Sequence, residues 1–130
     1  MQKIKFFLIF IFFGFSPLLA NAEWVKIYDP NGERFYDTNR VASKDGIIYV
    51  WEAVNLKPMP WVKEIQPKSS LVRKGYDCKG ETIALLETYD YSAPMGKGAL
   101  LSSKSYLDNL SWKSPPPGSD NEKNLLIFCK

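Results

Sequence analysis

The stretch Ile47–Val54, IIYVWEAV, decides the fold. It is rich in β-branched and aromatic side chains, which favour strands. Successive side chains of a strand point to opposite faces, so Trp51 and Ala53 share one face while Val50 and Val54 share the other. Because both faces are mostly apolar, we expect this strand in the middle of a sheet, covered on at least one side.

The segments on either side of this strand predict more strands separated by turns. Asn31-Gly32 and Asp45-Gly46 are turn signals, since these residues accept a positive φ. A helix is conceivable over 81–91, but the turns on both sides favour a strand there. The other expected strands are 24–28, 34–37, a short piece near 41, 69–78 and 99–106.

The C-terminus predicts one short helix. The proline-rich segment 114–119 is a stiff linker, and Ser119 with Glu122 forms a capping box at the helix start. The residues expected on its buried side are Leu125, Leu126, Phe128 and Cys129. The sequence therefore predicts an α+β fold, an antiparallel sheet of about five or six strands with one C-terminal helix docked on it.

Residues 1–22 are typical of a secretory signal peptide. Lys3 and Lys5 precede the apolar run Phe6–Phe15, and Ala20-Asn21-Ala22 supplies a small-x-small cleavage pattern. An uncleaved anchor is the alternative, but a spanning helix needs about 20 apolar residues and this run is shorter. We therefore expect cleavage after Ala22 and a single domain at residues 23–130.

The expected mature chain carries no sign of a membrane anchor. Glu23 stands where a bacterial lipoprotein would have its lipid-bearing cysteine, and no later apolar run is long enough to span a bilayer. We expect an exported protein, periplasmic or at the cell surface, without a lipid anchor. The sequence leaves its oligomeric state open.

The charge balance argues against a nucleic-acid partner. The full chain has a net charge of +3, and loss of Lys3 and Lys5 with the signal leaves +1. Nucleic-acid binding normally requires a strongly basic face.

Two cysteines in an oxidising compartment predict a disulfide between Cys78 and Cys129. A free reactive thiol or a pair of metal ligands is the alternative.

Catalytic motifs are absent from the sequence. The chain has no histidine, which common hydrolytic triads use as a base and zinc sites use as a ligand. Gly96-Lys97-Gly98 lacks the rest of a phosphate-binding loop. We expect no enzyme, catalytic residue, cofactor or metal. A small hydrolase built on carboxylates such as Asp37, Asp77 and Asp90 is the remaining alternative.

A binding surface is the better candidate. The proline-rich segment 55–68 and the strand after it place cations around a tryptophan, and Trp and Arg are residue types that anchor interfaces. The candidate partner-binding residues are Lys57, Trp61, Lys63, Lys68, Arg73 and Lys74. The alternative is that Trp61 packs over the sheet edge and the lysines are ordinary solvated charges. The other tryptophans, Trp24, Trp51 and Trp112, are expected in the core.

A series of short motifs over the mature chain resembles the surface-adhesin protein E domain family. The matching features are Trp24-x-x-Ile27, Tyr36-Asp37, Val50-Trp51, Tyr76-Asp77-Cys78, Gly96-Lys97-Gly98, Trp112, Pro117-Gly118-Ser119 and Cys129. The resemblance implies an antiparallel sheet, a C-terminal helix and a disulfide joining Cys78 to Cys129.

The resemblance also implies a function. The family is named for outer-membrane lipoproteins that attach bacteria to host matrix and plasma proteins such as vitronectin and laminin. It implies an exported, non-enzymatic binding domain with a protein partner. The alternative is a periplasmic accessory protein that contacts another envelope component and has no adhesin activity.

Overall fold

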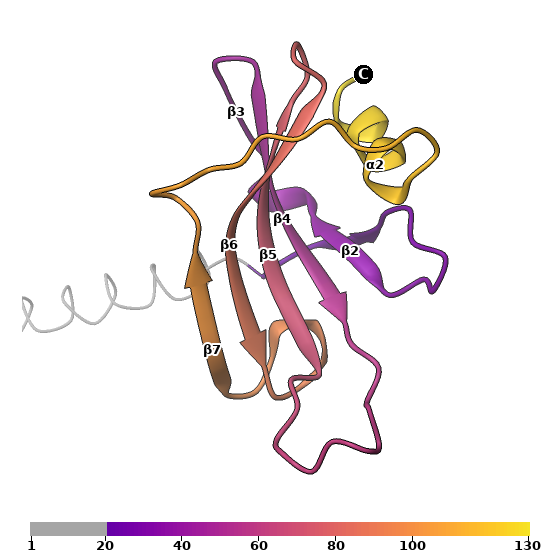
Figure 1. The fold of residues 1–130 in the computed structure, drawn as a ribbon, viewed down its shortest axis with the longest axis vertical. Coiled ribbons are helices and arrows are strands. Elements are labelled where there is room, and N and C mark those ends of the chain that lie inside the picture. Colours follow the sequence, from indigo (N-terminus) through magenta and orange to yellow (C-terminus); the bar gives the residue numbers. More distant parts are fainter. Residues whose placement is uncertain (1–20) are drawn as a thin grey trace, which may run out of the picture.

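The computed structural model describes residues 21–130, so nearly all of the predicted signal peptide, residues 1–22, lies outside the described residues. Within them the chain forms a single sheet and one α-helix, joined by loops and two short 3-10 helices (Figure 1). The elements are β1 (Trp24–Lys26), β2 (Arg34–Asp37), η2 (Thr38–Arg40), β3 (Ala42–Lys44), β4 (Ile47–Asn55), β5 (Ser69–Asp77), β6 (Thr82–Tyr91), η3 (Pro94–Gly96), β7 (Leu100–Ser105) and α2 (Asp120–Phe128).

All strand pairs of the sheet are antiparallel, in the order β1-β2-β4-β5-β6-β7. One edge of β4 is shared by two strands. The short β3 pairs with the first half of β4, and β2 pairs with the second half of β4. The predicted α+β fold is confirmed, with β4 inside the sheet and a strand rather than a helix at β6.

The turn between β3 and β4 shows how local sequence fixes the register. Asp45 and Gly46 both have positive φ, 54° and 80°. Two such residues form the turn whose twist matches that of the flanking strands. The register that follows pairs Lys44 with Ile47 and sets which β4 side chains face α2.

The core lies between α2 and one face of the sheet. Val50 and Tyr76 are fully buried there, and Leu125 of α2 packs against them. The Phe128 ring lies 5.0 Å from the Tyr36 ring and 4.8 Å from the Tyr76 ring, so the last turn of α2 contacts both β2 and β5. The chain reaches this position by crossing the sheet after β7 (Figure 1).

The helix start differs from the predicted capping box in one bond. The Ser119 hydroxyl accepts from the Glu122 amide at 3.2 Å, as predicted. The Glu122 carboxylate instead accepts from the Gly118 amide at 2.9 Å, because the Ser119 amide already donates to the Pro116 carbonyl.

The predicted buried face of α2 was wrong at one residue. Leu126 is 62% exposed, whereas Leu125 and the fully buried Asn124 face the sheet. Asn124 exchanges two hydrogen bonds with the Tyr28 backbone, at 3.0 Å and 3.3 Å. These bonds join α2 to the loop between β1 and β2.

The three tryptophans expected in the core are only partly buried. Trp51 lies on the face opposite α2, 5.9 Å from the Tyr89 ring. Trp112 covers Gly75, where a Cβ would come within 2.8 Å of the indole. Both rings cover the sheet from outside, because the volume between the sheet and α2 is filled by Tyr76, Phe128 and aliphatic side chains.

The predicted disulfide is confirmed. Cys78 follows β5, Cys129 caps the C-terminal end of α2, and their sulfur atoms are bonded across 51 residues of sequence. Neither cysteine is free for metal binding or thiol chemistry.

We predict that the double variant Cys78→Ser/Cys129→Ser loses about 4 kcal/mol of unfolding free energy, since it releases a loop of 51 residues. Urea unfolding of the oxidised wild type and the variant measures the difference. A loss below about 1 kcal/mol would mean that packing of α2, and not the covalent link, keeps the helix on the sheet.

Candidate functional site

The loop between β4 and β5, residues 56–68, projects beyond the end of the sheet that is farther from α2 (Figure 1). We call it the Trp61 loop. Its base is closed by backbone hydrogen bonds from Leu56 to the Lys68 carbonyl, 2.9 Å, and from Lys68 to the Tyr91 carbonyl, 2.8 Å. The loop is therefore anchored to both β5 and β6.

A single side chain organises the interior of the loop. The Gln66 amide accepts from the Met59 backbone N–H at 2.8 Å and donates to the carbonyls of Met59 and Val62 at 2.8 Å and 3.2 Å. The Val62 amide also bonds to the Met59 carbonyl, which closes a turn at the tip. Because of this clamp, Trp61 is presented by an ordered turn.

The tip of the loop carries large apolar side chains in solvent. Trp61 is 76% exposed and Ile65 is 84% exposed. The alternative that Trp61 packs over the sheet edge is therefore wrong. Three lysines and a single acid, Glu64, accompany these side chains along the loop.

Beside the loop base lies an apolar pocket of about 520 Å³. Its lining includes Leu56, Pro58 and Ile65 from the loop and Pro94 from η3. The Trp61 loop thus combines exposed apolar anchors, an adjoining hollow and excess positive charge, the mixture found at protein interfaces.

The structure divides the predicted site residues among three places. Lys57, Trp61, Lys63 and Lys68 lie together on the Trp61 loop, and all are exposed. Arg73 lies on the sheet face opposite α2, 5.3 Å from the Tyr49 ring and 3.7 Å from the Glu87 carboxylate.

Lys74 points the other way, towards α2, and its side chain is only 12% exposed. It contacts Glu52, a fully buried carboxylate of β4. The Glu52 carboxylate lies 3.1 Å from Arg34 and 3.3 Å from Lys74, and it accepts a short hydrogen bond from the Tyr76 hydroxyl. We call Arg34, Glu52, Lys74 and Tyr76 the Glu52 cluster.

Burial changes the protonation behaviour of this cluster. Desolvation lowers the pKa of Lys74, and the neighbouring Arg34 lowers it further, while Glu52 opposes both. Desolvation and the Glu52 charge together raise the pKa of Tyr76 above its usual range. In the sequence, the sign of this cluster is Glu52, the single acid in the strand IIYVWEAV. It was not among the predicted site residues.

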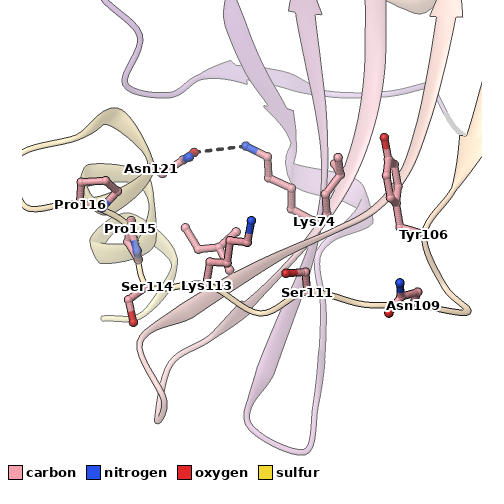
Figure 2. Close-up of a pocket in the computed structure, with 11 residues that line it drawn as sticks. Lys74, Tyr106, Asn109, Ser111, Lys113, Ser114, Pro115, Pro116 and Asn121 are labelled. Carbon is pink, nitrogen blue, oxygen red and sulfur yellow. Dashed lines mark hydrogen bonds between the residues drawn. The ribbon is translucent and has the colours of Figure 1, made fainter.

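A groove lies where Lys74 reaches α2 (Figure 2). Its volume is about 590 Å³, and it is bounded by β6, α2 and the segment 106–116 that crosses between them. Figure 2 shows Lys74 reaching from β5 to Asn121 of α2, a contact of 3.4 Å, with Lys113 on the segment that follows β7. We call this the Lys74–Lys113 groove.

The three carboxylates on which the hydrolase alternative rested lie on three different strands, and each is engaged locally. Asp37 of β2 accepts from the backbone of Glu23 and Asn39, and Asp77 accepts from the Gly80 amide. Asp90 of β6 accepts from the hydroxyls of Ser70 and Ser102. Within residues 21–130 no group of three or more acidic, cysteine or histidine side chains is placed to bind a metal ion.

Comparison with known proteins identifies relatives of the whole domain. The family model described as "Surface-adhesin protein E" matches residues 24–130. No curated protein sequence matches.

Crystal form II of Haemophilus influenzae protein E superimposes with a TM-score of 0.67 at 18% identity, covering 87% of this chain and 91% of that one. The crystal structure of protein E from non-typeable Haemophilus influenzae superimposes with a TM-score of 0.66 at 18% identity, covering 87% of this chain and 79% of that one. At this identity the likeness establishes the shared fold.

We predict that Tyr76→Phe destabilises the protein by roughly 1–3 kcal/mol, because the buried Glu52 carboxylate loses a donor that water cannot replace. Tyr89→Phe on the opposite face is the matched control and should change stability little. Denaturant unfolding at neutral pH measures both variants. Equal effects of the two changes would contradict a special role for the buried hydroxyl.

The pH dependence provides a second check. Between about pH 7 and pH 10 the Tyr76 hydroxyl is protonated in both states, so its ionisation does not change the gap between wild type and Tyr76→Phe. Above pH 10 only the unfolded wild type ionises, so the wild type should lose its advantage by about 1.4 kcal/mol per pH unit. A gap that widens in this range would mean that Tyr76 ionises more easily in the folded state.

Proposed function

Because the chain belongs to the surface-adhesin protein E family, we propose that it is an exported, non-enzymatic binding domain that recognises a protein partner through the Trp61 loop. The observation that carries the proposal is the 76% exposure of Trp61 on a loop ordered by Gln66. A large apolar side chain costs free energy in water unless a partner covers it. The ordered backbone holds the exposed side chain where a partner can contact it.

The order of the loop favours binding in a second way. Three prolines and the Gln66 bonds already restrict the backbone. Less conformational entropy is then lost when a partner immobilises the loop. The lysines around the apolar tip favour a partner surface with acidic groups near an apolar hollow.

The export part of the proposal rests on the sequence pattern of residues 1–22 and on the family. We propose cleavage after Ala22, release of a soluble domain beginning at Glu23, and a location at the cell surface or in the periplasm. Among residues 21–130 no helix has the length and apolar character needed to cross a bilayer.

We predict that Trp61→Ala/Lys63→Ala weakens binding to immobilised host matrix proteins, with vitronectin and laminin as the first probes, at least tenfold. The free energy of unfolding should stay within about 0.5 kcal/mol of the wild type, because both side chains are exposed. Surface plasmon resonance and urea unfolding measure the two quantities.

The matched control for this experiment is Leu126→Ala/Lys79→Ala, which removes an exposed apolar residue and an exposed lysine elsewhere. It should bind as the wild type does. Equal binding by both double variants and the wild type would remove the Trp61 loop from the site. A loss of binding by the control alone would move recognition to the α2 end of the molecule.

Protease treatment of intact and outer-membrane-permeabilised cells separates the two kinds of partner. A host-binding domain should be digested on intact cells. Digestion only after permeabilisation would contradict host binding and would favour the alternative, a periplasmic accessory protein that contacts an envelope component.

A further inference from the structure

The Lys74–Lys113 groove carries a charge pattern that the proposed function does not use. In the Glu52 cluster, one carboxylate faces two cations, Arg34 and Lys74. Lys113 adds another cation, and none of the eleven residues that line the groove is acidic. The groove therefore has an excess of positive charge, part of it on a side chain that is nearly removed from water.

The remaining lining divides into a polar and an apolar part. Tyr106, Ser111 and Ser114 contribute hydroxyl groups, and Asn121 contributes an amide. Ile83, Leu85 and Pro115 contribute apolar walls. Ligand sites commonly have this composition, mostly apolar with a few polar groups that fix orientation, and volumes of roughly 300–1,000 Å³.

The walls of the groove are preformed. The backbones of Ile83 and Lys113 exchange hydrogen bonds at 2.9 Å and 3.0 Å, so the crossing segment is paired to β6 beside the groove. Further along, the Tyr106 amide donates to the Leu86 carbonyl at 2.8 Å. Binding there requires little ordering of the backbone.

We propose that the Lys74–Lys113 groove binds a small organic anion with one charged head group and an apolar body. The head group would lie between the ammonium groups of Lys74 and Lys113, and the body against Ile83, Leu85 and Pro115. A bare inorganic anion would leave these apolar walls in water, and a neutral ligand would leave the excess charge without a counter-ion. The crossing segment and α2, which bound the groove, lie at the end of the sheet opposite the Trp61 loop (Figure 1), so the two sites can be tested separately.

The energetics of Lys74 support this assignment. Its pKa is lowered because burial and Arg34 together outweigh the attraction of Glu52. An anion in the groove would supply further negative charge to a cation that is only partly compensated. Lys113, by contrast, is exposed, so it can be replaced without disturbing the core.

The test uses residues 23–130 as secreted, with 3-phenylpropionate, its neutral amide and inorganic phosphate as separate probes. Amide chemical shifts of the ¹⁵N-labelled protein report both binding and its location. We expect 3-phenylpropionate to give saturable shifts at Ile83, Lys113 and Asn121, and to bind at least tenfold more tightly than either the amide or phosphate.

The variants are chosen so that folding is not at risk. Lys113→Gln should weaken 3-phenylpropionate about fivefold, as expected for one partly exposed ion pair. Lys97→Gln, an exposed lysine in the loop between β6 and β7, is the matched control and should leave the affinity unchanged. Because Lys74→Met breaks a buried ion pair, it is used only if its amide spectrum remains folded.

Three results would overturn the proposal. Equal affinity for the acid and its amide would show that charge does not contribute. Phosphate binding as tight as that of the acid would show that the apolar walls do not contribute. An affinity for 3-phenylpropionate that Lys113→Gln leaves unchanged, or amide chemical-shift changes that are absent from the groove residues, would place binding elsewhere.

Discussion

The buried carboxylate of Glu52 is the constraint around which the sheet and the helix are arranged. A charge without water needs counter-charges and hydrogen-bond donors, and a missing partner would cost several kcal/mol. Its partners come from β2 as Arg34 and from β5 as Lys74 and Tyr76. A shift of one residue in either strand pairing would move these groups to the other face, so the cluster favours a single register.

Under the proposed function, the same arrangement separates stability from recognition. At the α2 end, the disulfide, the Asn124 bonds to Tyr28 and the packing of Phe128 join helix to sheet. At the other end, hydrogen bonds at its base and from Gln66 hold the Trp61 loop, and Trp61 and Ile65 at its tip lie in solvent, outside the core. A rigid sheet that presents an ordered loop resembles other binding scaffolds, where loops vary while the framework stays constant. Side chains at the tip are therefore free to change without loss of the fold.

The sequence predicted what depends on local pattern. IIYVWEAV indicated an interior strand, Asp45-Gly46 indicated its turn, and Ser119 marked the helix start. The alternation of side chains along a strand also separates two predicted site residues. Neighbours in a strand face opposite ways, so Arg73 and Lys74 could not belong to one surface. Similarly, Leu125 lies one turn before Cys129, so the disulfide fixes the face of α2 and places Leu126 in solvent. The bonds between Asn124 and Tyr28 join residues 96 positions apart, and no local pattern indicates them.

The most direct test of the central claim, that the Trp61 loop is the recognition surface of a rigid scaffold, is hydrogen–deuterium exchange of the free and partner-bound protein. The account predicts slower exchange at residues 56–68 on binding, and unchanged exchange in β4, β5 and α2. Protection confined to β7 or to α2, with residues 56–68 unaffected, would contradict it.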